Sequence, residues 1–319
     1  MNFNSHNIIE ICNINLSSFR NSLEGINYEK GGIYNSEMLL FVSLIKHFGV
    51  NLIIESGRAR GQSTKVIAEN FKDSDYKIFS IEYNKYSSDV RISKEKLQNY
   101  KNINLLFGDS FKILPPLITE KCYVLIDGPK RVAAIQLAIE SLKNPLVKAV
   151  FIHDLYKDSP HRKVAEKIFN DYFFTDNKNY VNIFKSLDIN CWIEQRKYRE
   201  TQSWGPYKRG KKKFKSYAPT LLVIFNSENA FNLKEFTNHI NEIKLRKKSW
   251  KLKYILNGWP KRLSNILKFP SYYIYSEKVI NHKENINLID MMLKWVNRTY
   301  LNIRNLTKKR VSYYLIEKE

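Results

Sequence analysis

Cysteine is scarce in this sequence, and its three cysteines, Cys12, Cys122 and Cys191, lie far apart. Three scattered thiols exclude a disulfide-stapled domain, and they lack the spacing of a zinc site. The chain also has no run of the roughly 18 consecutive apolar residues that a membrane-spanning helix needs. Its first residues, MNFNSHNIIEIC, lack the basic start and apolar core of a secretion signal. We therefore expect a cytoplasmic protein that is not integral to a membrane.

Acidic residues are few beside basic ones: 31 Asp and Glu stand against 53 Lys and Arg, so the formal net charge is +22. The excess is concentrated late in the chain. Residues 1–195 hold 25 basic and 22 acidic side chains, whereas residues 196–215 hold 9 and 1, and residues 230–319 hold 19 and 7. This distribution predicts a nearly neutral globular core with two basic additions, an insert and a C-terminal region, that suit an anionic partner.

The most informative stretch is 52–64, LIIESGRARGQST, in which an apolar run ends in an acid and leads through a loop with two glycines to a helix start. The apolar run predicts a buried parallel strand. The glycines allow a tight turn and a close approach to a ligand, and either hydroxyl residue can cap the helix. Such a strand, loop and helix start are typical of a nucleotide-cofactor site. The candidate residues are Glu55, Gly57, Gly61, Ser63 and Thr64.

Short apolar runs alternate with longer amphipathic stretches as far as residue 173, which predicts βαβ units and a parallel sheet. The expected helices cover residues 36–48, 63–71, 87–99, 131–143 and 161–173. The expected strands end at or near Glu55, Glu82, Asp109, Asp127 and the pair His153 and Asp154. Because the carboxyl ends of parallel strands share one edge, we expect these side chains to line a ligand crevice.

Beyond residue 175 the pattern changes. Segments 179–195 and 216–227 are predicted as two strands with no helix between them, joined by the basic insert 196–215. We expect this pair to be antiparallel and to lie at the sheet edge. Residues 230–319 are mainly helical in pattern. The predicted organisation is an N-terminal segment 1–35, a domain 36–229 and a basic C-terminal region 230–319.

Over residues 36–226 the order of these motifs resembles the class I S-adenosylmethionine-dependent methyltransferases. The closer likeness is to the catechol-type, macrocin-type and cephalosporin-hydroxylase-like branch. The matching residues are Glu55, Gly57, Gly61, Ser63 and Thr64 after the first strand, Asp127, Gly128 and Lys130 after the fourth, and His153 and Asp154 after the fifth. The resemblance implies an α/β, Rossmann-like sheet of seven strands, mostly parallel with an antiparallel last strand. It also implies S-adenosyl-L-methionine as cofactor.

The resemblance also implies how the cofactor is held. Gly57 and Gly61 would line its methionine part, and Glu82 would accept hydrogen bonds from both ribose hydroxyls. Asp109 and Ser110 would lie at the adenine edge. The full set of implied cofactor-binding residues is Glu55, Gly57, Gly61, Ser63, Thr64, Glu82, Asp109, Ser110 and Asp127.

The loop departs from the commoner family motif at Ala59, where that motif has a middle glycine, and it carries Arg58 and Arg60. These two arginines can meet the cofactor carboxylate, meet an acidic substrate or be solvated. We expect at least one of them to be solvated.

Methyl transfer needs an acceptor held in line and a group that removes its proton. Enzymes of the resembled branch often use a divalent metal, and Asp127 and Asp154 are oxygen ligands suited to Mg²⁺, with His153 or water completing the shell. Many class I methyltransferases need no metal, so this alternative stays open. Lys130 matches a catalytic lysine of the catechol-type enzymes, and His153 is the rival base. The candidate catalytic residues are Lys130, His153 and Asp127.

The function expected from these motifs is O-methylation of a hydroxyl on a sugar, a glycan or a small hydroxylated acceptor. The alternatives are an RNA methyltransferase guided by the basic insert and a non-catalytic binding protein that retains the fold. The C-terminal region mixes basic and aromatic residues, which favours peripheral contact with an anionic membrane surface over nucleic acid. A basic, helical surface that is only solvated remains an alternative.

Overall fold

The computed structural model describes residues 5–29, 31–201 and 219–239. The chain divides into two compact units, Met1–Glu235 and Phe236–Glu319, and the sheet with its helices belongs to the first. The core of the basic insert and nearly all of the C-terminal region, including its predicted helices, lie outside the described residues. Within the described part, no helix is both long enough and apolar enough to cross a membrane.

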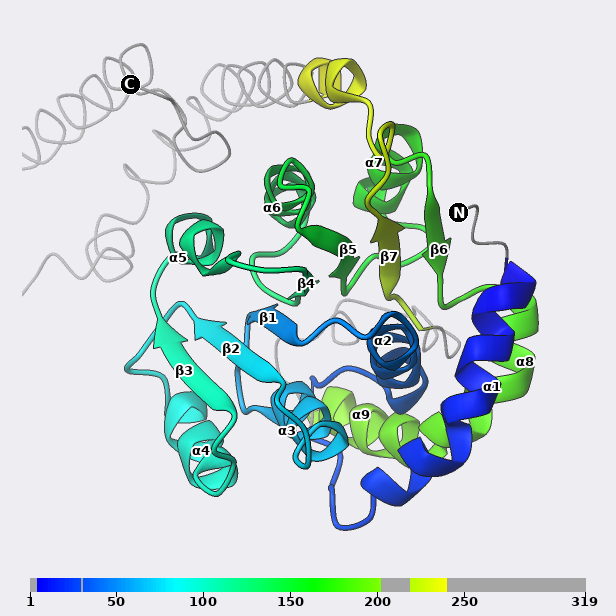
Figure 1. The fold of residues 1–319 in the computed structure, drawn as a ribbon. Coiled ribbons are helices and arrows are strands. Elements are labelled where there is room, and N and C mark those ends of the chain that lie inside the picture. Colours follow the sequence, from blue (N-terminus) through cyan, green and yellow to red (C-terminus); the bar gives the residue numbers. More distant parts are fainter. Residues whose placement is uncertain (1–4, 30, 202–218, 240–319) are drawn as a thin grey trace, which may run out of the picture. The chain divides into compact units, whose positions relative to one another are not determined.

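In the described part of the chain, seven strands form one sheet in the order β3-β2-β1-β4-β5-β7-β6 (Figure 1). Strand β7 runs antiparallel to both of its neighbours, β5 and β6, and the other neighbouring strands are parallel. The strands are β1 (Leu52–Ser56), β2 (Lys77–Glu82), β3 (Ile103–Phe107), β4 (Cys122–Ile126), β5 (Val147–Ile152), β6 (Tyr172–Phe174) and β7 (Leu222–Phe225). The predicted seven-stranded, mostly parallel sheet with an antiparallel last strand is confirmed.

Helices cover both faces of the sheet, with α5, α6 and α7 on one side and α2, α3 and α4 on the other (Figure 1). The central strands β1 and β4 are therefore buried at every residue, which explains why both read as continuous apolar runs. The helices are α1 (Ser5–Ser22), α2 (Asn35–Phe48), α3 (Gln62–Asn70), α4 (Ser88–Leu97), α5 (Ser110–Leu117), α6 (Val132–Leu142), α7 (Pro160–Ile168), α8 (Lys178–Phe184) and α9 (Ile189–Thr201), with a 3₁₀ turn η1 (Lys185–Asp188) before α9.

Segment 179–195, predicted as a strand, is helical. Asn177 caps α8 through its side chain, which accepts from the amides of Asn179 and Tyr180. The buried residues Tyr180, Phe184, Asp188 and Cys191 recur three or four positions apart, which is the helical period. The sixth strand is instead β6, whose Phe173 pairs with β7 inside what was predicted as the end of a helix. That helix, α7, ends at Ile168.

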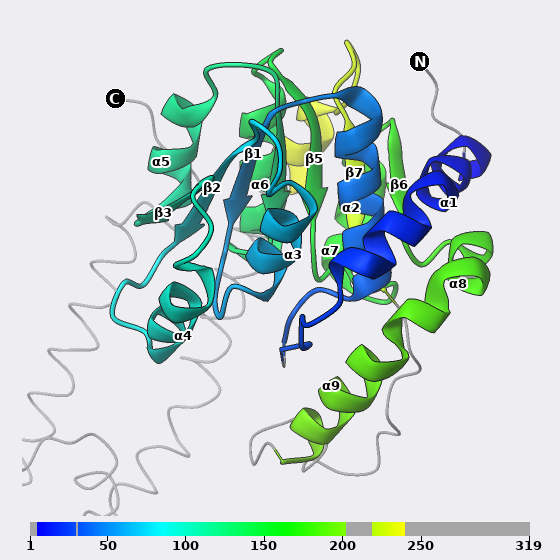
Figure 2. The same cartoon turned by 60° about the horizontal axis from the view of Figure 1, so that its bottom comes forward.

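The N-terminal segment carries a helix that the sequence pattern did not indicate. Helix α1 packs on α2 and buries Ile8, Cys12 and Phe19 in the main core. Figures 1 and 2 both place α1 beside α8, and the Cys12 thiol lies 3.9 Å from the Tyr180 hydroxyl. All three cysteines are free and buried.

Helix α5 is a second element absent from the sequence prediction. Asp109 caps it, because its side chain accepts from the amide of Phe111 at 3.0 Å. Pro115 and Pro116 lie in its last turn. Because proline is disfavoured inside helices, these two prolines argued against a helix that the apolar positions around them would otherwise have indicated.

Candidate active site

The glycine loop after β1 meets the loop after β4 backbone to backbone. Gly57 has φ +94°, and a Cβ there would lie 2.3 Å from the amide nitrogen of Gly128. Gly61, at φ +75°, faces Ser93 and Leu97 of α4 in the same way. Both glycines are therefore required by neighbouring protein atoms, whereas the sequence pattern suggested the approach of a ligand as the reason for them. Their place beside the cofactor stays a prediction.

Glu55 is completely buried, and three hydroxyl groups donate to its carboxylate. Ser63, Thr64 and Ser80 each lie 2.5 Å from it. Burial raises the pKa of Glu55 above its ordinary value, although the three hydroxyls and Arg58 act in the opposite direction. The oxygens of Glu55 thus join β1 to α3 and β2, and its contact with the cofactor stays a prediction.

The two hydroxyl residues at the start of α3 also differ from prediction. Ser63 and Thr64 were expected to cap the helix, but the cap position belongs to Gly61, which has no side chain to bond the first amides. Both hydroxyls turn inward to Glu55, and both residues are buried. The amide groups at the start of α3 consequently have no side-chain cap.

The two arginines of the loop differ, because Arg58 is buried whereas Arg60 is about one-third exposed. Arg58 is 2% exposed; its Nη1 donates to the carbonyl of Ser80 at 2.5 Å, and its guanidinium lies 4.9 Å from the centre of the Phe107 ring. Arg60 is held between Asp89 at 2.9 Å and Glu29 at 3.6 Å. Arg60 is thus committed to two carboxylates, whereas the buried Nη2 of Arg58 has no hydrogen-bond partner.

Glu82 ends β2 with capacity to accept further hydrogen bonds. One oxygen accepts from the amide of Ala59 at 2.7 Å, and the other makes only a 3.4 Å contact with the amide of Asn84. Asp109 has one oxygen committed to the α5 cap, and the Ser110 hydroxyl lies 2.7 Å from the Ser56 hydroxyl. Of the predicted ribose and adenine residues, Glu82 is thus the one most open to a ligand.

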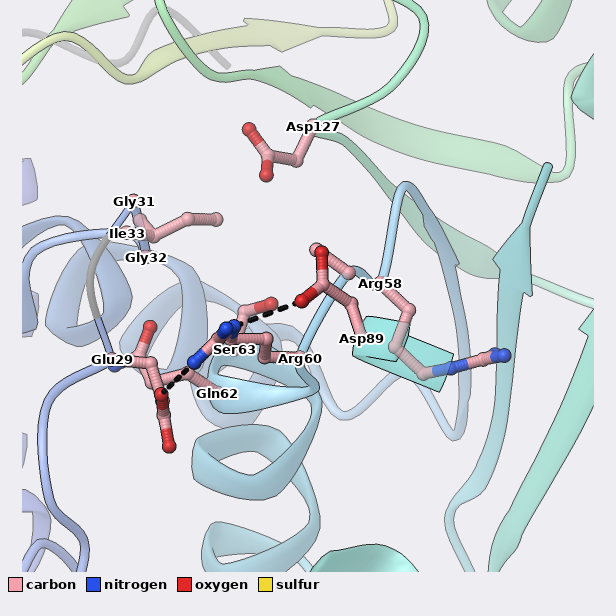
Figure 3. A pocket seen from close by; sticks show the side chains of 11 residues that line it. Glu29, Gly31, Gly32, Ile33, Arg58, Arg60, Gln62, Ser63, Asp89 and Asp127 are labelled. Carbon is pink, nitrogen blue, oxygen red and sulfur yellow. Dashed lines mark hydrogen bonds and ion pairs between the residues drawn. The ribbon is translucent and has the colours of Figure 1, made fainter. Parts of the chain in front are cut away.

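A cavity of about 310 Å³ opens beside this loop (Figure 3). One wall is formed by the segment that joins α1 to α2. The lining residues are Glu29, Gly31, Gly32, Ile33, Arg58, Ala59, Arg60, Gln62, Ser63, Asp89 and Asp127. The sequence pattern did not single out Glu29, Gly31, Gly32, Gln62 or Asp89. Of these, only the position of Gln62 at the helix start offered a signal.

Gln62 is the most informative residue of this lining. It is 4% exposed, and neither its amide nitrogen nor its amide oxygen has a hydrogen-bond partner. A Cβ on Gly32 would lie 2.3 Å from the Gln62 oxygen and 2.9 Å from the Glu29 carbonyl oxygen, so a larger residue on the opposite wall would displace the Gln62 amide. Because a buried, unpaired amide costs roughly 1–3 kcal/mol, the arrangement suits a ligand that both donates and accepts hydrogen bonds.

A second group of charges lies at the ends of β4 and β5. Asp127 accepts from His153 Nδ1 at 2.6 Å and from the Lys130 ammonium group. Lys130 also pairs with Asp154 at 2.8 Å, and the other imidazole nitrogen lies 3.4 Å from Glu37. The predicted catalytic and metal-binding residues are therefore gathered in one place, and Asp127 also lines the cavity.

The electrostatics of this cluster bear on its predicted bases. Burial lowers the pKa of His153, but Asp154, Asp127 and Glu37 outweigh burial and raise it well above its ordinary value. The pKa of Lys130 is likewise raised by two carboxylates against the effect of burial. Both groups therefore hold their protons in this arrangement, which argues against His153 or Lys130 as general base.

Comparison with protein-family models and with curated proteins gave no match. Among solved structures, the chain is similar to cofactor-bound Rv0187 from MTB, with 13% identity over 67% of this chain and 90% of that one and a TM-score of 0.37. It is also similar to the O-methyltransferase TomG from Streptomyces achromogenes, with 15% identity over 51% of this chain and 84% of that one and a TM-score of 0.37. A third similar structure is the Podospora anserina methyltransferase PaMTH1, with 14% identity over 60% of this chain and 78% of that one and a TM-score of 0.36.

The order and direction of the strands identify the fold. The fold is the Rossmann-like class I methyltransferase fold. In this fold the carboxyl edge of β1, β2, β4 and β5 is the ligand-binding edge. The glycine loop, Glu82, the cavity and the charged cluster all lie along it.

The residues along this edge suit S-adenosyl-L-methionine and a metal ion to different degrees. An unpaired Gln62 amide, uncapped amides at the start of α3 and a carboxylate at Glu82 suit a zwitterionic amino-acid end and a ribose diol. Candidate ligand atoms of Asp127, His153 and Asp154 lie within 4.8 Å of one another, and two carboxylates suit Mg²⁺. Lys130 now pairs with both carboxylates, so a metal would have to displace its ammonium group.

Proposed function

We propose that the protein is an S-adenosyl-L-methionine-dependent O-methyltransferase. The observation that carries this proposal is the coincidence of the strand order with a cavity whose buried Gln62 amide lacks partners on both its polar atoms. A fold retained only as a scaffold has no need to keep such an unpaired group beside the ligand-binding edge.

The cofactor is held along the edge from β1 to β3. The Gln62 amide and the first amides of α3 bind the amino-acid end, and Glu82 accepts from the ribose hydroxyls. Asp109 and Ser110 lie at the start of α5, where the adenine edge is expected. When bound, the cofactor supplies an activated methyl group on a sulfonium, and the protein contributes orientation and the removal of a proton.

The acceptor hydroxyl binds beside Asp127, which lies both in the cavity lining and in the charged cluster. The carboxylate of Asp127 accepts the hydrogen bond from that hydroxyl and receives its proton as the methyl group is transferred. Lys130 and His153 orient the carboxylate and offset the buried negative charge. Where Mg²⁺ is bound by Asp127 and Asp154, it would lower the pKa of the acceptor hydroxyl and replace the ammonium group of Lys130.

The acceptor class we propose is a sugar, a glycan or another small hydroxylated molecule. The support comes from the sequence resemblance. The basic C-terminal region, with 19 basic and 7 acidic side chains, suits an anionic membrane surface on which such an acceptor is presented. An RNA acceptor would be recognised by strong salt dependence of binding.

Calorimetric titration with S-adenosylhomocysteine tests the proposal. We expect micromolar binding by the parent protein and at least about tenfold weaker binding by Glu82→Ala, because the ribose diol loses its charged acceptor. Glu120→Ala is the matched control, since Glu120 is exposed and pairs only with Lys77 among the described contacts. Absence of binding by the parent protein would exclude the methyltransferase function.

Acceptor screening follows once cofactor binding is established. Methyl transfer is measured with hydroxylated small molecules, glycans and RNA, each with and without Mg²⁺. Asp127→Asn should abolish transfer while leaving titration with S-adenosylhomocysteine within about threefold, because Asp127 acts on the acceptor. Transfer that persists in Asp127→Asn would refute the role given to this carboxylate.

A further inference from the structure

The wall of the cavity opposite α3 has little stiffness of its own. It is formed by Glu29, Gly31, Gly32 and Ile33, from the segment that joins α1 to α2. Gly31 adopts φ +81°, and no neighbouring atom lies within 4 Å of where its Cβ would be. Two adjacent glycines allow many backbone conformations, so contacts from elsewhere must hold this wall in place.

The most direct of these contacts comes from α9. The amide of Gly31 donates to the side-chain oxygen of Gln195 at 2.8 Å. The Tyr28 hydroxyl donates to the carbonyl of Gly32 at 2.7 Å and lies 3.5 Å from the same Gln195 oxygen. The Gln195 side-chain oxygen is therefore close to both the Gly31 amide and the Tyr28 hydroxyl that bonds Gly32.

The chain on either side of the glycine pair is held independently. The turn η1 anchors the start of α2, where Ser36 donates to Asp188 through its amide at 2.8 Å and through its hydroxyl at 2.5 Å. On the other side, Glu29 pairs with Lys96 of α4 at 2.8 Å. These contacts fix the ends of the segment. Gln195 bonds Gly31, the neighbour of Gly32, which faces Gln62 and donates its own amide to the Glu29 carbonyl at 2.8 Å.

We propose that Gln195 is a positioning residue that sets the cofactor affinity of the cavity by holding the Gly31–Gly32 wall against Gln62. The inference rests on the proposed function, since the ligand of that cavity is the amino-acid end of the cofactor. Without the Gln195 oxygen, the Gly31 amide turns to water and the glycine pair populates other conformations. Only the fraction of molecules with the wall in its binding conformation can then bind the cofactor, so the observed affinity falls in proportion to that fraction.

The test compares three variants by titration of the full chain with S-adenosylhomocysteine. Gln195→Ala removes the acceptor and should weaken binding about three- to tenfold, as expected for one hydrogen bond. Gln195→Glu keeps a side-chain oxygen for the Gly31 amide and should bind within about twofold of the parent. Glu194→Ala, the neighbouring exposed residue that pairs with Lys197, should also bind like the parent.

A cofactor-independent measurement separates failure of this inference from failure of the proposed function. Hydrogen exchange of the unliganded chain should be faster at Gly31 and Gly32 in Gln195→Ala than in Glu194→Ala, with unchanged exchange in α2 and β1. Equal exchange in the two variants, or binding by Gln195→Glu as weak as by Gln195→Ala, would overturn the inference. A parent protein that binds no S-adenosylhomocysteine overturns the proposed function, and the exchange result still decides whether Gln195 holds the wall.

Discussion

Two carboxylates at the same sheet edge have opposite surroundings: Glu55 is completely buried, whereas Asp154 is about one-third exposed. Glu55, within β1, is bonded by the neutral hydroxyls of Ser63, Thr64 and Ser80, and burial raises its pKa. Burial also acts to raise the pKa of Asp154, after β5, but His153 and Lys130 outweigh it and hold that pKa below its ordinary value. Neutral hydroxyl partners suit a carboxylate with a structural role, whereas charged partners are typical of a carboxylate in a functional site.

The largest expected effect comes from a substitution in the glycine loop after β1, where its backbone contacts the backbone of the loop after β4. Gly57→Ala places a Cβ 2.3 Å from the amide nitrogen of Gly128 at φ +94°. We expect a loss of about 3 kcal/mol of unfolding free energy or failure to fold, from strain and overpacking together. Denaturant unfolding measures it.

Gly25→Ala is the control for this change, because Gly25 has φ +75° but no atom within 4 Å of a Cβ. It should lose only about 1 kcal/mol, the cost of the left-handed backbone alone. Equal losses in the two variants would show that the close approach to Gly128 contributes nothing.

The next effect concerns the partners of Glu55. Glu55→Ala leaves three buried hydroxyls without their acceptor, so we expect a loss of about 2–3 kcal/mol in thermal or denaturant unfolding. Glu140→Ala, which removes an exposed glutamate paired with Lys143, should stay within about 0.5 kcal/mol. A small loss of unfolding free energy in Glu55→Ala would mean that β1, α3 and β2 keep their arrangement without the hydrogen bonds of Glu55.

The pH dependence of stability should differ in sign between the two carboxylates. Because the folded-state pKa of Asp154 is lowered, its stabilising contribution is present above about pH 4 and is lost as pH falls through the folded-state pKa. Because the folded-state pKa of Glu55 is raised, its contribution falls as pH rises from about 4.5 through that raised pKa.

Unfolding curves of the parent, Asp154→Asn and Glu55→Gln between pH 3 and pH 8 measure this difference. The parent's advantage over Asp154→Asn should be constant above about pH 4 and begin to shrink below it, whereas its advantage over Glu55→Gln should shrink toward high pH. Parallel curves for the two variants would contradict the contrast between hydroxyl and charged partners.

The smallest expected effect is at the rim of the cavity. Arg60 is about one-third exposed and joins Glu29 to Asp89, so Arg60→Ala should cost only about 0.5–1 kcal/mol of stability. Weak, exposed ion pairs are screened by salt, so the difference from the parent should shrink between 0.05 and 0.5 M NaCl, which are roughly the limits over which screening changes strongly. A difference that is independent of salt would show that packing of the arginine stem dominates.

Strand positions were predictable because their apolar runs follow from burial on both faces of a parallel sheet. Leu52–Ser56 and Cys122–Ile126 are buried throughout and needed no tertiary information. Segment 179–195 was misread because its apolar residues at helical spacing are separated by polar ones and also fit a two-residue alternation in part. Its helical conformation was decided by the Asn177 cap and by packing of Tyr180 and Phe184 in the core.

The candidate site was predictable in its strand-end residues and not in its cavity. Asp127, Lys130, His153 and Asp154 are brought together as predicted, because parallel strands carry their carboxyl ends to one edge. Which of them hold protons depends on the number of carboxylates around each, and the buried Glu37 from α2 was absent from the sequence-based site.

The sequence alone determined the fold class and the edge at which chemistry takes place, because periodicity and strand-end residues are local properties of the chain. Only the tertiary structure decided that Glu55, Ser63 and Thr64 face inward, that Arg58 is buried, and that Gln62 lines a cavity walled by a distant segment. Those outcomes depend on contacts between residues far apart in sequence. A local pattern carries no information about which partner satisfies a buried polar group.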